Sequence, residues 1–337
     1  MKLYPEEWKA FISFQENESN HFPEITNQQK KTLLERAHVL KGWQKKNIRL
    51  HNIITASVLI FNLSMLAFLG LVLPTLVQIS FLQQAFISLL YGLIAYGLSV
   101  YSLHELNGHN QGFIGNSKFI KLLDFFAKNA CRISHADPVF YKTQHYSHHT
   151  YTGTEEDKAF TNAISFKRFL ISIIPFAVAT PFCDYKIHTS DEWSKSKAIS
   201  EILSTILLLA ITINLYFTQR WGHALIFVTV APWSSFFFDR LRETSEHNFM
   251  PNSKGSEARS FGLSFWGLVV GGGPWGQCCH LMHHISPSLP WYLQITLQRD
   301  FEKMLTSKQK SVYLSGGFFN YILLWRDIIK KQHRYFH

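Results

Sequence analysis

Charged residues are scarce in this chain, and cysteine is scarcer. Only 17% of the 337 residues are charged, below the ~25% that is usual in soluble domains. An ordinary soluble protein, a coiled coil and a disordered chain are therefore all disfavoured. The four cysteines include no C-x-x-C pair and are too few for a disulfide scaffold, which fits a reducing compartment. Because residues 1–22 contain no apolar core, we expect no cleavable signal peptide.

The longest stretch without any charged residue lies between Arg49 and Glu105. As a single helix it would be on the order of 80 Å long, whereas the hydrocarbon core of a bilayer is ~30 Å thick. We therefore predict a membrane hairpin with spans at about 53–76 and 82–103. Two further uncharged runs predict a second hairpin with spans at about 202–219 and 221–238. The expected fold is all-α, a multi-pass integral membrane protein with four transmembrane helices.

Basic residues are concentrated before the first predicted span and after the second, and the turn between these spans has none. By the positive-inside rule, both termini and the long middle loop lie in the cytoplasm. This topology explains the net charge of +10 without nucleic acid, for which no fold signature is present. We expect a cytoplasmic amphipathic and basic segment at 1–49, a membrane domain at 50–299 and a cytoplasmic tail at 300–337.

Histidine is abundant, and nine of the 17 histidines form a pattern. An H-x(4)-H motif follows the second predicted span, an H-x(2)-H-H motif lies in the middle loop, and another lies near the C-terminal end. A single histidine follows the fourth span. These residues are His104, His109, His145, His148, His149, His247, His280, His283 and His284. Because positions i, i+3 and i+4 share a helix face, each H-x(2)-H-H motif directs three imidazoles to one side, where a helical cap over the membrane domain can hold them.

The first motif requires a distorted helix, because positions i and i+5 lie roughly 140° apart on a regular α-helix. We expect the helix to end or bulge between His104 and His109, where Asn107-Gly108 offers a break. Nine imidazoles exceed the three or four protein ligands of one zinc ion, so their number favours two metal ions. Imidazole binds Fe, Zn, Cu or Ni, and the lack of thiolate ligands argues against an iron–sulfur cluster.

This pattern resembles the integral-membrane fatty-acid desaturase family and its relatives, the membrane alkane hydroxylases. Members carry an H-x(3–4)-H box and two H-x(2)-H-H boxes after paired membrane hairpins, and the similarity covers residues 49–299. The run His283-His284-Ile-Ser-Pro287-Ser-Leu-Pro290 resembles the tail of the third box. Glu246-His247 is similar to the Glu-His pair that follows the last span, and residues 151–157 are similar to the segment after box two.

The resemblance implies a non-haem di-iron enzyme in which the nine histidines bind two Fe²⁺ ions. With O₂ as co-substrate, the centre would remove hydrogen from a long acyl chain and leave a C=C bond. Electrons would come from a separate donor of the ferredoxin or cytochrome b5 type with its reductase, because no His-Pro-Gly-Gly motif indicates a fused cytochrome b5 domain. We expect Glu105, Asp157 and Glu246 to accept the far imidazole N–H of a ligand.

One position departs from the family pattern. Relatives often place Asn four residues before the histidine that follows the last span, where it is thought to contact a metal through water. Here the residue is Glu243. Its carboxylate either ligates a metal directly or pairs with Arg240 or Arg242, and we favour pairing.

Other functions stay open at this point. A hydroxylase or monooxygenase of alkyl, sphingoid or terpenoid chains uses the same scaffold, and the sequence separates it poorly from a desaturase. A membrane metal transporter or sensor predicts ionisable residues at mid-span, and the predicted spans have none. The short termini and the lack of a lysine-based retrieval ending favour a bacterial inner membrane over the endoplasmic reticulum. Substrate chain length, head group and oligomeric state are not predicted.

Overall fold

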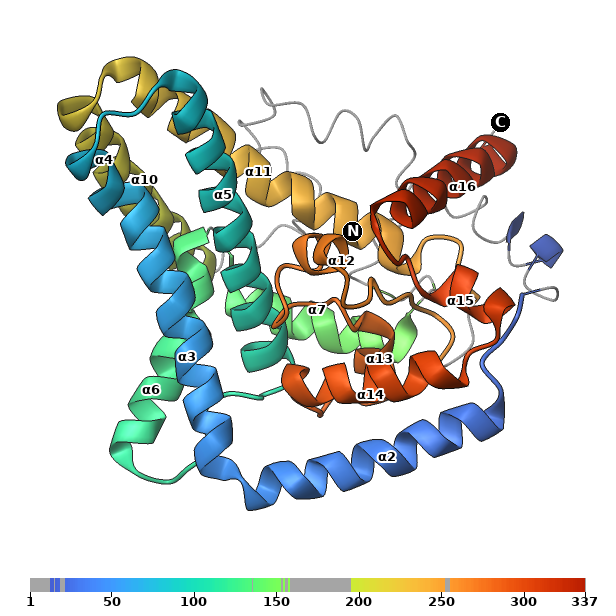
Figure 1. Ribbon diagram of the computed structural model, residues 1–337. Coiled ribbons are helices and arrows are strands. Elements are labelled where there is room, and N and C mark those ends of the chain that lie inside the picture. Colours follow the sequence, from blue (N-terminus) through green and yellow to red (C-terminus); the bar gives the residue numbers. More distant parts are fainter. Residues whose placement is uncertain are drawn as a thin grey trace.

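The computed structural model describes residues 13, 14, 16–18, 22–134, 136–152, 154, 157, 195–251 and 255–336. These residues form helices and connecting turns, with one isolated bridge between Ser260 and Leu314 and no strand among them (Figure 1). Four helical stretches in this part of the chain are long and apolar enough to cross a membrane: Ile48–Leu76, Phe81–Gly108, Lys195–Thr218 and Trp221–His247. The predicted all-α class and the predicted number of such helices are confirmed. Of the amphipathic and basic segment expected at 1–49, residues 1–12, 15 and 19–21 lie outside the described residues.

A short turn joins the first two stretches. The first consists of α3 (Ile48–Ala67), the π-helical segment η2 (Phe68–Val72) and α4 (Leu73–Leu76). The second begins with α5 (Phe81–Val100), whose N-terminus is closed by a capping box between Ser80 and Gln83. From the neighbouring stretch, the Gln219 amide donates hydrogen bonds to the carbonyls of Pro74 and Val77 and holds this turn in place.

The other two stretches are α10 (Lys195–Thr218) and α11 (Trp221–His247). Helices α5 and α11 pack closely, because a Cβ atom at Gly92 would collide with the Ala231 carbonyl oxygen. The stretches Phe81–Gly108 and Trp221–His247 continue past the predicted ends of their spans at 103 and 238, and they end at histidine motifs. Hydropathy marks where a chain leaves the hydrocarbon layer, but the backbone hydrogen bonds of a helix continue independently of that boundary.

The remaining helices include those that carry the two H-x(2)-H-H motifs. Figure 1 shows α2 (Asn27–Lys46) crossing the end of α3 and running alongside α14 (Trp291–Met304). Leu33, Leu297 and Phe301 are fully buried in the core that these two helices share. The other elements are η3 (Tyr101–Gly108), α6 (Lys118–Asn129), η4 (Ala130–Ser134), α7 (Pro138–Tyr151), α12 (Phe265–Val270), α13 (His280–Ile285), α15 (Ser307–Tyr313) and α16 (Phe318–Phe336).

Candidate metal centre

The H-x(4)-H motif lies on a π-helix. In η3 the His109 backbone N–H donates to the His104 carbonyl at 3.1 Å, which is an i to i+5 bond. This wider turn brings the two imidazole rings to a centroid separation of 5.0 Å. The distortion expected between the two histidines is thus present, and it extends over the whole of η3. Glycine is required at its end, because a Cβ atom at Gly108 would lie 2.7 Å from Cδ2 of His145.

The nine predicted histidines come together in two adjoining groups. Group A contains His104, His109, His145 and His283, and group B contains His148, His247, His280 and His284. Within each group, one possible ligand atom per residue lies within 4.8 Å of all the others. His149 adjoins group A, because its Nε2 atom is 2.8 Å from Nε2 of His283 and 3.1 Å from Nε2 of His145. We therefore treat His149 as the fifth member of group A.

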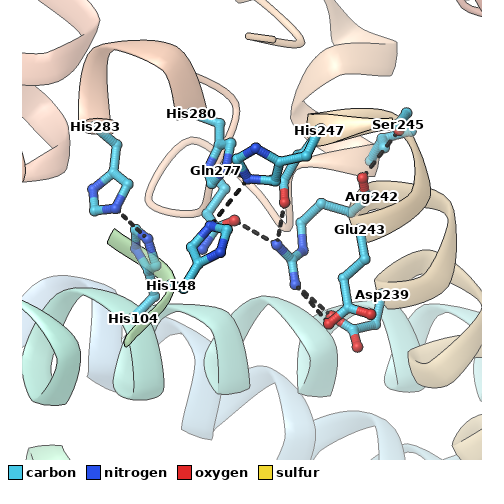
Figure 2. Close-up of polar contacts among 12 residues, drawn as sticks. His104, His148, Asp239, Arg242, Glu243, Ser245, His247, Gln277, His280 and His283 are labelled. Atoms are coloured by element: carbon cyan, nitrogen blue, oxygen red, sulfur yellow. Dashed lines mark hydrogen bonds and ion pairs between the residues drawn. The ribbon is translucent and has the colours of Figure 1, made fainter. Parts of the chain in front are cut away.

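The Nε2 atoms within each group face one another. In group A, Nε2 of His104 lies 2.9 Å from Nε2 of His283. In group B, Nε2 of His247 lies 3.1 Å from that of His148 and 2.8 Å from that of His280, as Figure 2 shows. All four members of group B are buried, as are His104, His145 and His283 of group A. Both groups are therefore closely packed sets of nitrogen ligands.

The partners of the Nδ1 atoms, the far ring nitrogens that do not face the other histidines of the group, decide which ring nitrogen carries the proton. Nδ1 of His148 lies 2.9 Å from the Asp157 carboxylate, and Nδ1 of His247 lies 2.8 Å from the Glu257 carbonyl oxygen. Since these oxygens accept, both Nδ1 atoms carry a proton, and in the neutral form of each ring the Nε2 atom presents a lone pair. Two lone pairs 3.1 Å apart repel each other unless a cation lies between them. The donor set of group B therefore fits a metal ion.

Two of the predicted carboxylates contact far nitrogens, and a third lies close to one. Glu105 approaches Nδ1 of His104 at 3.1 Å, Asp157 contacts His148 as described, and Glu246 lies 3.5 Å from Nδ1 of His280. Glu257 was not among the predicted residues, and its carboxylate lies 3.5 Å from Nδ1 of His284. No motif spacing marks Glu257, because it reaches the centre from the loop after α11. Such partners fix the orientation of a ligating ring and raise its basicity.

Glu243 lies among arginines rather than in either histidine group (Figure 2). Its carboxylate is 2.7 Å from Nη1 of Arg240 and 3.7 Å from Nη2 of Arg242. This placement favours pairing over direct ligation. Arg242 also contacts Glu246 at 2.6 Å, so it holds the carboxylate that faces His280.

Burial keeps most of the rings uncharged. It lowers the pKa of His109 to about 3, with a further contribution from nearby His284. Burial also lowers the pKa of His149, His280 and His283. His148 differs: burial alone would lower its pKa, but the Asp157 carboxylate raises it above the usual value. Neutral imidazole is the form that ligates metals, so the protein environment prepares most of these rings for that role.

Comparison with known proteins gives no relative. No protein-family model, no curated protein and no solved structure matches this chain. Support for a function therefore comes from the geometry of groups A and B and from the histidine motifs.

Proposed function

We propose that this protein is a membrane-bound, non-haem di-iron enzyme that uses O₂ to introduce a C=C bond into a long acyl chain. The observation that carries the proposal is the convergence of nine imidazole Nε2 atoms from η3, α7, α11 and α13 into two adjoining groups. Such nitrogen-only ligand sets suit redox-active iron and leave no role for thiolate.

The two groups lie close enough to act on one substrate. The ring centroid of His149 in group A is 4.7 Å from that of His284 in group B. Adjoining metal ions can share the charge changes of one reaction, which a single isolated ion cannot do. This proximity supports a di-iron function over two independent structural metals.

We place the four long helical stretches across the membrane as two hairpins, with the remaining helices as a cytoplasmic cap. The stretches that bear histidines end at Gly108 and His247, so both would deliver their ligands to the same side. The positive-inside distribution of basic residues assigns that side to the cytoplasm. A substrate chain in the membrane would then reach the metal centre at the edge of the inner leaflet.

The residues of this chain have three tasks in the proposed reaction. When bound, the irons would supply the O₂ chemistry that removes hydrogen from an unactivated C–H bond. The histidines offer Nε2 lone pairs, and Glu105, Asp157 and Glu257 hold the opposite ring nitrogens. Burial of group B and of His104, His145 and His283 in group A limits the access of water, which favours oxidation of the acyl chain over loss of oxidising equivalents to solvent. An external redox protein would provide the electrons.

Expression in a host that lacks desaturases tests the proposal, with lipids profiled by mass spectrometry. We expect products that have lost two hydrogens and are absent from cells with the His284→Ala variant. Purified protein should contain two irons per chain. Gain of one oxygen without loss of hydrogen would instead assign the chain to the hydroxylases. Unchanged lipids together with iron-free protein would refute the proposed iron-dependent enzyme.

A further inference from the structure

A groove on the protein surface lies outside groups A and B, between the second half of α11, α12 and α16. Its volume is about 560 Å³, within the range of sites that hold small ligands. Phe237 and Leu241 of α11 form one wall, and Trp266 of α12 lines one end. The walls are almost entirely apolar, so the groove suits a hydrocarbon chain.

The opposite wall is a straight row of side chains on α16. Phe318, Ile322, Trp325 and Ile329 stand at positions i, i+4, i+7 and i+11, so they share one helix face. At 1.5 Å per residue the row is roughly 16 Å long. An extended acyl chain can lie along such a row.

The two ends of the groove differ in charge. Arg326 and Lys330 lie one helical turn apart at the end nearer the C-terminus of α16. Their carbon stems line the groove, and because both side chains are exposed, their charged groups lie at its rim. Within the described part of the chain, no carboxylate forms an ion pair with either of them. The groove therefore offers an apolar end for a tail and a cationic end for an anionic head.

Exposed aromatic rings surround the apolar end. Phe265 is 82% exposed and Phe319 is 80% exposed. The first turns of α12 and α16 are joined by a hydrogen bond from Ser264 Oγ to the Gly316 carbonyl at 2.8 Å, so these rings belong to one surface. An apolar patch of this kind is unfavourable in water and marks contact with a partner or a membrane. Its continuity with the groove indicates that lipid is the occupant.

We propose that this groove binds an anionic phospholipid of the surrounding membrane. One acyl chain lies along the Phe318–Trp325 row, and the phosphate lies between Arg326 and Lys330. A guanidinium and an ammonium group one turn apart can both donate charge-assisted hydrogen bonds to one phosphate. Binding of this lipid does not depend on the proposed desaturase activity.

The groove is also linked to α11, the helix that carries His247 of group B. Tyr321 lines it, and its hydroxyl donates to the Leu241 carbonyl at 2.9 Å and lies 3.2 Å from Ser245 Oγ. Ser245 precedes His247 by two residues on α11. If the proposed function holds, the bound phospholipid contacts α11, the helix that carries His247 of group B.

Tryptophan fluorescence tests the site, because Trp266 and Trp325 line it. Purified full-length protein in mixed micelles is titrated with brominated phosphatidylglycerol or brominated phosphatidylcholine, since bromine quenches nearby indoles. We expect saturable quenching by the anionic lipid at roughly tenfold lower concentration than by the zwitterionic lipid. A Trp266→Phe/Trp325→Phe variant should lose this saturable component. Equal titration curves for the two lipids in the wild-type protein would overturn the proposal.

Charge variants locate the head group. In Arg326→Gln/Lys330→Gln the preference for phosphatidylglycerol should fall at least severalfold, towards equality with phosphatidylcholine. The matched control is Lys303→Gln, because Lys303 is a largely exposed residue of α14 outside the groove. Iron content, measured on the same samples, reports whether the metal centre is intact. A double variant that keeps its iron and its full lipid preference would show that the anionic lipid binds elsewhere.

Discussion

Groups A and B both take histidines from the two H-x(2)-H-H motifs, but each motif contributes different positions to each group. In α7, the i and i+4 histidines, His145 and His149, belong to group A, whereas the i+3 histidine belongs to group B. In α13 the i and i+4 histidines, His280 and His284, belong to group B, whereas His283 belongs to group A. Each short helix thus serves both groups and ties them together. Neither group can form without both helices.

The surroundings of the two groups differ more than their ligands do. In group B, carboxylates of Asp157, Glu246 and Glu257 lie within 3.5 Å of three far nitrogens. In group A only Glu105 plays this part. Among the described residues Nδ1 of His283 has no hydrogen-bond partner, and in group B the same is true of Nδ1 of His280, which has only the nearby Glu246 carboxylate. Nearby carboxylates make an imidazole a stronger ligand. We therefore expect group B to hold its metal more tightly than group A.

Removing a ligand gives the largest effect and tests whether the two groups depend on each other. We expect His148→Ala or His284→Ala to abolish turnover while the protein stays in the membrane. His109→Ala in group A should do the same if both irons are needed. Iron per chain, measured on purified protein, should fall from about two to one or fewer, because the damaged group loses its donor set. Retained activity in any of these variants would contradict the assignment of that histidine.

The sequence points to the nine histidines that converge in the structure, but not to how they divide between group A and group B. Spacing identifies all nine histidines and the need for a distorted helix between His104 and His109. It also places Glu105 and Glu246 beside ligands, because they are neighbours of His104 and His247 in the chain. It does not separate group A from group B, since i+3 and i+4 share a helix face until another helix packs against it. Glu257 was missed because its contact with His284 depends on how a loop folds back.

Removing the Glu257 carboxylate should weaken group B alone. Glu257→Gln keeps the size of the side chain and the backbone carbonyl that faces His247. Because His284 would lose an anionic neighbour, we expect the metal affinity of group B to fall by about 10- to 100-fold. Titration of the loaded protein with a chelator measures this, and Glu302→Gln on α14 is the control. If release of the more tightly held metal is unchanged, the difference between the groups does not come from Glu257.

Removing a partner of a far nitrogen in group A should weaken metal binding less than Glu257→Gln does in group B. The Tyr141 hydroxyl lies 3.3 Å from Nδ1 of His145, and burial raises the pKa of this phenol, so the hydroxyl stays neutral. A neutral partner polarises an imidazole less than a carboxylate does. We expect Tyr141→Phe to weaken metal binding in group A only a fewfold in the same chelator titration. A loss as large as that of Glu257→Gln would contradict the proposed contrast between the groups.

The smallest effect is expected at Glu243, which lies four residues before His247 on the side of group B. Its carboxylate is 2.7 Å from Arg240, and a partly exposed ion pair of this kind contributes at most about 1 kcal/mol to stability. Glu243→Asn should therefore leave two irons per chain and slightly lower the thermal midpoint of unfolding. Asp239→Asn is the matched control, because Asp239 pairs with Arg242 on the same helix at 2.8 Å and is further in sequence from His247. If Glu243→Asn alone changes the iron content, Glu243 is a ligand of group B, and the greater affinity of that group includes a direct carboxylate bond.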